Sequence, residues 1–169
     1  RGSEWPVDVD CRSEPTDSRN VVADVGPETA EAVFLTAHVD AHDIADGAND
    51  NGAGSALVAE VGRLLARDAV DLDTRVRLIT FGAEEVGLWG AYHAVDSHDL
   101  DAIRAVVNLD GACSSRNLWV GSNGFDALTD LFESVTDDLD ASLSTDDPIS
   151  PHGDQWAFVQ EGVPAAVGA

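Results

Sequence analysis

The segment A-V-F-L-T-A-H-V-D, residues 32–40, has the pattern of a buried strand that ends in polar side chains. Its apolar part, residues 32–37, is short and bounded on both sides, as expected for a strand inside a parallel sheet. A polar loop with several glycines follows, and apolar residues then recur at the spacing of an amphipathic helix over residues 57–65. A buried strand followed by such a helix is typical of α/β proteins.

Strands and helices are predicted to alternate on both sides of this segment. Further strands are expected at residues 7–11, 20–25, 75–81, 103–109, 118–121, 141–144 and 163–167, and further helices at residues 88–95, 125–135 and 156–160. The first two of these strands are predicted to form an antiparallel pair at a sheet edge. We therefore expect an α/β fold with a mixed, mostly parallel central sheet sandwiched by helices. No repeat or long linker divides the chain, so residues 1–169 are predicted to form a single domain.

The chain is strongly acidic, with 32 Asp and Glu residues against 9 Lys and Arg and a formal net charge of -23. This charge argues against nucleic acid and anionic membranes as partners. No apolar run reaches the about 18 residues that a membrane span needs. The basic residues are all Arg and Asp outnumbers Glu, a bias that resembles proteins of salt-loving archaea. We therefore expect a fold that weakens in dilute buffer. A cytoplasmic location is expected as well.

Polar residues follow three of the predicted strands at the point where each strand ends. These residues are His38, Asp40, Glu84, Glu85 and Asp110. Because parallel strands end at a common edge of a sheet, we expect these side chains to converge. Carboxylates a few ångström apart repel each other, and a divalent cation between them removes this problem. Mixed imidazole and carboxylate ligands favour zinc, with manganese or cobalt as substitutes, over calcium.

A glycine-rich loop adds a further carboxylate to this predicted metal site. The loop G-A-N-D-N-G-A-G, residues 47–54, allows the backbone to turn tightly and approach the site. Asp50 in this loop is our candidate for a carboxylate that bridges two metal ions. Asp40 lies two residues beyond His38, on the same side of the strand, and is expected to orient the imidazole ring.

Each of these residues also has an ordinary structural explanation. Glu84 and Glu85 lie at a corner where one side chain can bind metal while the other accepts a proton from water, but the pair could equally be a solvated acidic corner. His38 alone could be a structural histidine, Asp50 a turn residue or helix cap, and Asp110 the cap of a turn. Their joint occurrence at successive strand ends favours the metal site.

Six short motifs carry a resemblance to a known family. They are H-V-D at 38–40, G-A-N-D-N-G-A-G at 47–54, F-G-A-E-E-V-G-L-W-G at 81–90, N-L-D at 108–110, D-Q-W-A-F at 154–158 and G-V-P at 162–164. In this order they resemble the co-catalytic dizinc aminopeptidases of the bacterial leucyl aminopeptidase type, which include glutamate carboxypeptidase relatives. The resemblance implies a zinc-exopeptidase-like fold of the phosphorylase/hydrolase-like kind, a peptide substrate and two zinc ions.

The resemblance also implies a role for each site residue. His38 and Asp110 would hold one zinc ion, and Glu85 would hold the other. Asp50 would bridge the two ions, and Glu84 would be the general base. A strained or cis peptide bond is implied after Asp50.

One departure from the family pattern leads to a further expectation. The resemblance implies another histidine ligand downstream of residue 164, and the sequence reaches Ala169 without one. We therefore expect a fragment truncated at both ends, in which the second metal is weakly held and activity can be missing. His152 is the other histidine that could reach the site. The oligomeric state is left open.

Two other functions stay open as alternatives. A glutaminyl-cyclase-like acyltransferase would share the fold but use a single zinc ion. A non-catalytic, peptidase-like binding module would keep the architecture and lose its ligands. The intact set of site residues favours a metal-dependent aminopeptidase over both alternatives.

Overall fold

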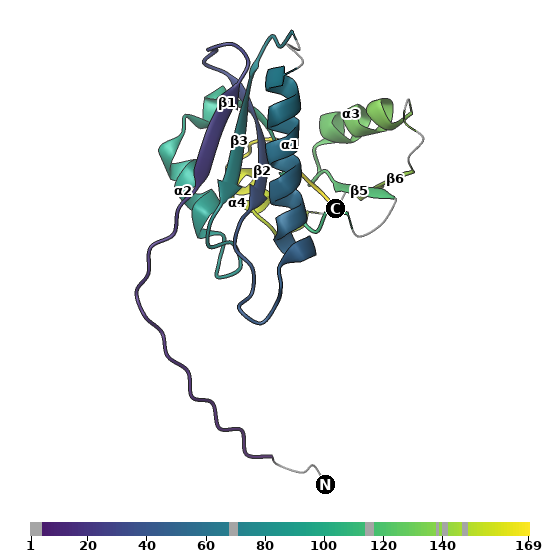
Figure 1. Ribbon diagram of the computed structural model, residues 1–169. Helices are drawn as coiled ribbons and strands as arrows, with labels where there is room; N and C mark the ends of the chain where they lie inside the picture. Colours follow the sequence, from purple (N-terminus) through teal and green to yellow (C-terminus); the bar gives the residue numbers. More distant parts are fainter. Residues whose placement is uncertain (1–4, 68–70, 114–116, 138, 140–141, 147–148) are drawn as a thin grey trace.

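The computed structural model describes residues 5–67, 71–113, 117–137, 139, 142–146 and 149–169. Within them a seven-stranded sheet is flanked by helices (Figure 1). The strands are β1 (Val21–Val25), β2 (Ala32–His38), β3 (Arg75–Phe81), β4 (Ile103–Leu109), β5 (Leu118–Gly121), β6 (Leu143–Asp146) and β7 (Ala165–Gly168). The helices are α1 (Gly54–Arg67), α2 (Trp89–Ser97), α3 (Asp126–Thr136) and α4 (Gln155–Gln160), with short helical turns at Ala48–Ala53 and Leu100–Ala102.

The sheet is mixed and mostly parallel, which confirms the predicted fold class. Its strands lie in the order β1-β3-β2-β4-β7-β5-β6. β2 is parallel to both β3 and β4, and β4 is parallel to β7. β5 is parallel to β6, whereas β1 is antiparallel to β3 and β5 is antiparallel to β7. The three central strands β2, β3 and β4 therefore end at the same edge of the sheet.

The strand predicted at residues 7–11 is wrong. These residues have no regular secondary structure, and the side chain of Val7 is 81% exposed. The segment before β1 runs away from the sheet in Figure 1. Alternating Val and Asp residues resemble a strand, but here the valines have no sheet face to pack against, and strand formation depends on such packing. β1 does lie at the sheet edge, as predicted, but its antiparallel partner is β3.

Helices cover both faces of the central strands, as predicted. α1 packs on one face, while α2 and α4 pack on the other (Figure 1). Side chains along β2 alternate between these layers. Phe34 packs edge-on against Phe158 of α4, with ring centroids 6.1 Å apart, whereas Ala37 belongs to a cluster with Val58 of α1. Gly62 of α1 allows close approach to the sheet, because a Cβ atom there would lie 2.2 Å from Leu78 Cδ1.

The sheet continues beyond β7 with β5 and β6, which α3 covers. Val120, Leu128 and Ala166 form the buried centre of this part. The strand predicted at residues 141–144 corresponds to β6, and residue 141 lies outside the described residues. Among the helices of the described ranges, none is both long and apolar enough to cross a membrane.

Candidate metal centre

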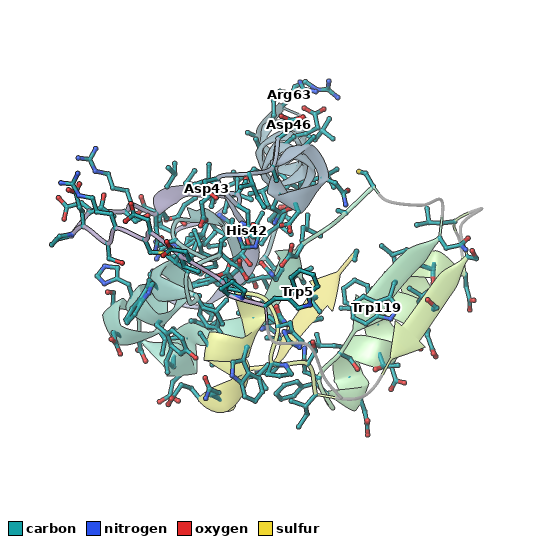
Figure 2. The ribbon with its side chains drawn as sticks, turned by 90° about the horizontal axis from the view of Figure 1, so that it is seen from below. Trp5, His42, Asp43, Asp46, Arg63 and Trp119 are labelled. Atoms are coloured by element: carbon teal, nitrogen blue, oxygen red, sulfur yellow. The ribbon has the colours of Figure 1, made fainter. Side chains whose placement is uncertain are left out.

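The predicted site residues meet at the edge where the central parallel strands end. His38 is the last residue of β2, Glu84 and Glu85 follow β3, and Asp110 follows β4. Asp50 joins them from the Ala48–Ala53 turn, which precedes α1. Figure 2 views the molecule from this edge and shows the loop between β2 and α1 there. Parallel strands thus bring together residues that are far apart in the sequence.

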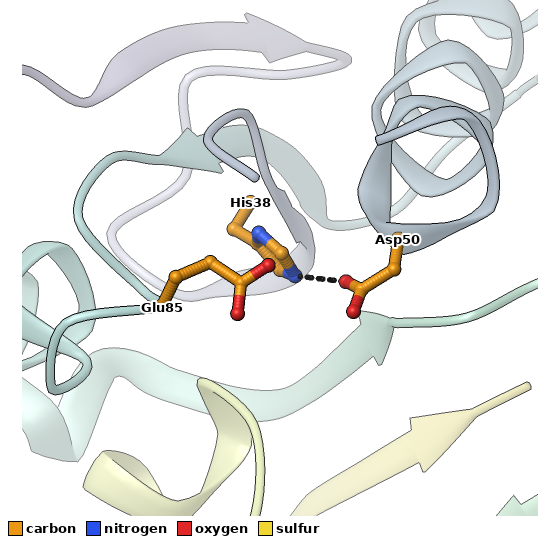
Figure 3. Close-up of side chains that lie close together, drawn as sticks. All are labelled: His38, Asp50 and Glu85. Atoms are coloured by element: carbon orange, nitrogen blue, oxygen red, sulfur yellow. Dashed lines mark ion pairs between the residues drawn. The ribbon is translucent and has the colours of Figure 1, made fainter. Parts of the chain in front are cut away.

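His38 lies at the centre of this group and is only 1% exposed. Its Nε2 atom is 3.1 Å from Asp50 Oδ1 and 3.4 Å from Asp110 Oδ1. Figure 3 shows the ring directed at the carboxylate of Asp50, with Glu85 beside it. The Oε2 atom of Glu84 is 4.0 Å from the same nitrogen. A buried imidazole therefore faces several carboxylates through one nitrogen.

Two overlapping groups of side chains offer ligand atoms that lie within 4.8 Å of one another. One group consists of His38, Asp50 and Glu85, and the other of His38, Glu84 and Asp110. His38 is common to both groups. The described residues therefore provide neighbouring positions for cations around one imidazole.

Buried contacts fix the loop that carries Asp50. The amide of Asn51 donates a hydrogen bond to the carbonyl oxygen of Leu109 at 2.8 Å, and its side-chain oxygen accepts one from the N–H of Gly54 at 3.1 Å. Ser55 donates to the carbonyl oxygen of His38 at 2.7 Å. The peptide bond between Asp50 and Asn51 is cis, as the family resemblance implied. These contacts tie the Asp50 loop to the ends of β4 and β2.

Asp40 organises the site through both its backbone and its side chain. Its carbonyl oxygen lies 3.0 Å from His38 Nδ1, and its carboxylate is 3.7 Å from the same atom. The two carboxylate oxygens accept hydrogen bonds from the N–H groups of Glu84 and Glu85, at 3.1 and 3.2 Å. Asp40 thus contacts the imidazole mainly through its backbone, and its carboxylate holds the corner after β3.

The imidazole of His38 titrates under opposing influences. Burial lowers the pKa of His38, but the hydrogen bond with Asp110 and the negative charges of Asp110 and Glu84 outweigh burial and raise this pKa to about 9. An imidazolium is therefore the favoured form in the absence of another cation. The proton on Nε2 occupies the position where a metal ion would balance the same carboxylates.

Glu84 is held partly in the neutral form. Burial raises the pKa of Glu84, and the negative charges of Asp110, Glu85 and Asp40 add to this effect. The charge of His38 opposes it, and the pKa reaches about 7. Together, Glu84, Asp110, Glu85 and Asp40 bring more negative charge to the site than the single imidazole of His38 can compensate.

The atoms of the site fit a bound zinc ion. In a neutral His38 with its proton on Nδ1, toward the Asp40 carbonyl, the lone pair of Nε2 would face two carboxylate oxygens, and a cation between them removes the repulsion. Two ligands at about 2.1 Å from one tetrahedral zinc ion lie about 3.4 Å apart, which matches the separations around Nε2. Oε1 of Glu85 is buried, and no residue in the described part of the chain forms a hydrogen bond with it. An additional cation would satisfy this atom.

The edge of the site is open to solvent through a cleft of about 480 Å³. The cleft is lined by Asp50, Glu84, Glu85, Gly87, Leu88, Asp110, Pro151, His152 and Gly153. His152 therefore reaches the site, in agreement with the expectation from its sequence position. The lining combines the carboxylates with residues 151–153, so a small ligand in the cleft can contact both.

Comparison with known proteins identifies the family. A model of "Peptidase family M28" matches residues 20–168. The chain belongs to peptidase family M28. Aminopeptidase YwaD of Bacillus subtilis (strain 168) is 40% identical over 82 residues, which cover 47% of this M28 chain and 18% of that protein. Leucine aminopeptidase 2 of Trichophyton equinum is 31% identical over 163 residues, which cover 86% of the chain and 32% of the relative. The chain thus spans about a third or less of the length of these relatives.

Solved structures agree with the M28 assignment. The zinc aminopeptidase BSAP from Bacillus subtilis superposes with a TM-score of 0.77 at 28% identity, over 88% of this chain and 39% of that chain. A glutaminyl cyclase from an Acidobacteriales bacterium gives a TM-score of 0.70 at 20% identity, over 88% and 57% of the two chains. At that identity the likeness to the cyclase concerns the fold alone. The family and its zinc aminopeptidase structures imply zinc for this M28 site.

Two residues near the M28 site were missed in the sequence. The His42 side chain is 63% exposed, and its Nε2 atom lies 3.0 Å from Oε2 of Glu85. Figure 2 shows His42 on the loop after β2. Asp154 belongs to the D-Q-W-A-F motif, and it is a buried carboxylate with 0% exposure. For His42, the only sequence signal was its position two residues after Asp40. No sequence signal indicated that Asp154 is buried.

Proposed function

We propose that the protein to which this chain belongs is a two-zinc aminopeptidase, and that this site is its catalytic centre. The observation that carries the proposal is the buried imidazole of His38 facing Asp50 and Asp110 at 3.1 and 3.4 Å, with Glu84 and Glu85 on the same edge. Membership of peptidase family M28 and the zinc aminopeptidases among the similar structures support it.

In this proposal the ligands divide between two neighbouring ions. His38 and Asp110 would hold one zinc ion, Glu85 would hold the other, and Asp50 would contribute to both. Support comes from the two overlapping groups of ligand atoms, which place Asp50 with Glu85 in one group and His38 with Asp110 in the other. Bound zinc would supply Lewis-acid chemistry, polarising the scissile carbonyl group and making water a stronger nucleophile near neutral pH.

Glu84 is assigned the proton transfers. Its carboxylate lies 4.0 Å from His38 Nε2, close to the ligands without making the short contacts that Asp50 makes. The backbone N–H of Glu84 donates a hydrogen bond to Asp40, which fixes the backbone from which the Glu84 side chain extends. Glu84 would take a proton from the attacking water and return it to the amine that leaves when the peptide bond breaks.

The cleft favours a substrate with a positively charged end. Carboxylates of Asp50, Glu84, Glu85 and Asp110 line it, and a protonated α-amino group is attracted to such a surface. This charge pattern supports an exopeptidase that acts at a free amino terminus. The residue preference would depend on the lining that the 151–153 segment provides.

The test of this proposal separates proton transfer from metal binding. Glu84→Gln keeps the size of the side chain and removes its basicity. We expect hydrolysis of aminoacyl anilides, assayed in high salt with added zinc, to fall by about 100- to 10,000-fold while the zinc content stays the same. Glu60→Gln, which removes an equal charge from the exposed side of α1, is the matched control and should keep full activity.

Each alternative outcome has a specific meaning. Loss of zinc together with activity in Glu84→Gln would place Glu84 among the ligands. Full activity in that variant would contradict the proposed base. Absence of zinc binding by the unmodified protein would contradict the proposed function itself.

A further inference from the structure

Asp154 is the buried acid that the proposed mechanism does not use. It immediately precedes α4 and has 0% exposure. Among the residues that the structure describes, neither carboxylate oxygen has a hydrogen-bond partner. An Asp at this position commonly caps a helix through its side chain, but no such hydrogen bond forms here. The fold of α4 therefore gives no reason for a carboxylate at this position.

The neighbours of Asp154 belong to the metal centre. A Cβ atom placed on Gly153 would lie 3.1 Å from Oδ2 of Asp110, so the backbone next to Asp154 runs directly against a proposed zinc ligand. Gly153 also lines the cleft, whereas Asp154 does not. Burial first, and then the charges of Glu84 and Asp110, raise the pKa of Asp154 to about 8. The charges of the proposed ligands therefore act on this carboxyl group, which is mostly protonated near pH 7 in the zinc-free chain and would ionise once cations balance those charges.

The nearby polar residues on β2, β4 and α4 are satisfied without Asp154. Asn108 accepts a hydrogen bond from Thr36 at 2.8 Å and donates one to Gln155 at 3.3 Å. Gln155 in turn donates to the carbonyl oxygens of Ser150 and His152. These residues form a connected buried network, and Asp154 takes no part in it.

A buried carboxyl group without a partner destabilises the fold. If the group stays ionised, no partner replaces the hydration that it loses on burial. If it takes up a proton, folding must supply the free energy of protonating a group that is ionised in the unfolded chain. An amide of the same shape would avoid most of this cost. Groups that cost stability in this way occur mainly at functional sites.

We propose that Asp154 is a positioning residue of the metal centre. Its buried negative charge strengthens the binding of cations by His38 and by the carboxylates at the edge where the central strands end, and Asp154 itself does not contact an ion. The inference rests on the proposed function, because it requires metal binding at this edge. Asp154 belongs to neither group of candidate ligands and does not line the cleft, so its effect is through charge.

Asp154→Asn tests the inference with two measurements whose expected changes have opposite signs. The substitution keeps the shape and removes the charge. We expect zinc affinity, measured by competition with a chromophoric chelator, to fall about tenfold. We expect the unfolding temperature of the zinc-free chain to rise, because a buried carboxyl group without a partner is removed. A purely structural role for Asp154 would instead lower the unfolding temperature.

The matched control is Asp43→Asn, which removes one charge from the exposed loop after β2 (Figure 2). It should change zinc affinity less than twofold and leave the unfolding temperature unchanged. An equal loss of affinity in both variants would show that only net charge matters and would overturn the inference. A zinc-free Asp154→Asn chain that is less stable, or that fails to fold, would also overturn it.

The same experiment distinguishes this inference from the proposed function. Tight zinc binding by the unmodified chain, with unchanged affinity in Asp154→Asn, would contradict the role of Asp154 alone. Failure of the unmodified chain to bind zinc at all would contradict both. Replacement of Asp154 by Ser, which is neutral and smaller, should reproduce the loss of affinity and so exclude an effect peculiar to the amide.

Discussion

Carboxylates have opposite surroundings at the two edges of the central sheet, where its parallel strands begin and where they end. At the edge where β3 and β4 begin, acids are paired with arginine. Arg77 binds both carboxylate oxygens of Asp24, at 2.8 and 2.7 Å, and Arg104 lies 3.9 Å from Glu31. At the edge where these strands end, the ion pairs of the described carboxylates are with His38 and with His42.

The difference is visible in how the acids titrate. The hydrogen bonds from Arg77 are the main cause that lowers the pKa of Asp24. Burial is the main cause that raises the pKa of Glu84 to about 7 and of Asp154 to about 8. One edge thus uses its acids to hold strands together, and the other keeps acids whose charge only additional cations can balance. Local surroundings, more than the overall acidity of the chain, determine what each carboxylate does.

The largest expected effect comes from removing an acid at the site edge. Asp110→Asn keeps the side-chain shape but weakens a ligand that lies 3.4 Å from His38 Nε2. We expect zinc affinity to fall by about 100-fold or more, since the loss of a direct ligand should exceed the 10- to 100-fold cost of removing an outer partner. Glu31→Gln, at the opposite edge, should leave zinc affinity unchanged in the same chelator competition. Similar affinities for both variants would contradict the contrast between the edges.

The site edge was predictable because its residues follow strand ends. The apolar run before His38 and the one before Asp110 each identify a buried strand, and parallel strands must end together. The glycine-rich loop around Asp50 carried a separate signal, since only a tight turn can bring that carboxylate back to β2 and β4. The parallel topology therefore predicts that these separate motifs come together in one site.

Residues whose roles depend on packing were not predictable. His42 approaches Glu85 through a loop conformation that no periodicity encodes. Asp154 is buried because α4 packs against the sheet, and the sequence shows only a polar residue before a short apolar segment. The valines of residues 7–11 alternate as in a strand but have no face to cover. In each case a long-range contact, present or missing, decides the outcome.

The second prediction uses pH to separate the two edges in the zinc-free chain. The pKa values of His38, Glu84 and Asp154 are raised on folding to about 9, 7 and 8, so the folded chain binds these protons more tightly than the unfolded chain, and its stability falls as the pH rises through these values. The pKa of Asp24 is lowered, so its contribution is lost as the pH falls instead. We expect urea unfolding in a chelator to show declining stability from about pH 5 to pH 9.

Zinc should reverse this dependence, because metal ligands bind in their deprotonated forms. With saturating zinc, stability should rise with pH over the range in which His38 and the carboxylates lose their protons. Parallel pH profiles with and without zinc would show that these groups do not bind the ion. A zinc-free profile that rises between pH 5 and pH 9 would contradict the raised pKa values.

The smallest expected effect comes from removing the ion pair between Asp24 and Arg77, at the edge where acids are paired with arginine. Asp24→Asn removes the charge from the two-point contact with Arg77, whose side chain is 19% exposed. Because the pair is partly solvated, we expect the unfolding free energy of the zinc-free chain to fall by only about 1 kcal/mol in low salt. Molar salt should reduce this difference, since it screens partly exposed charges. Zinc affinity should stay unchanged, because Asp24 acts at the opposite edge, and a weaker hold on zinc in Asp24→Asn would show that the two edges are not independent.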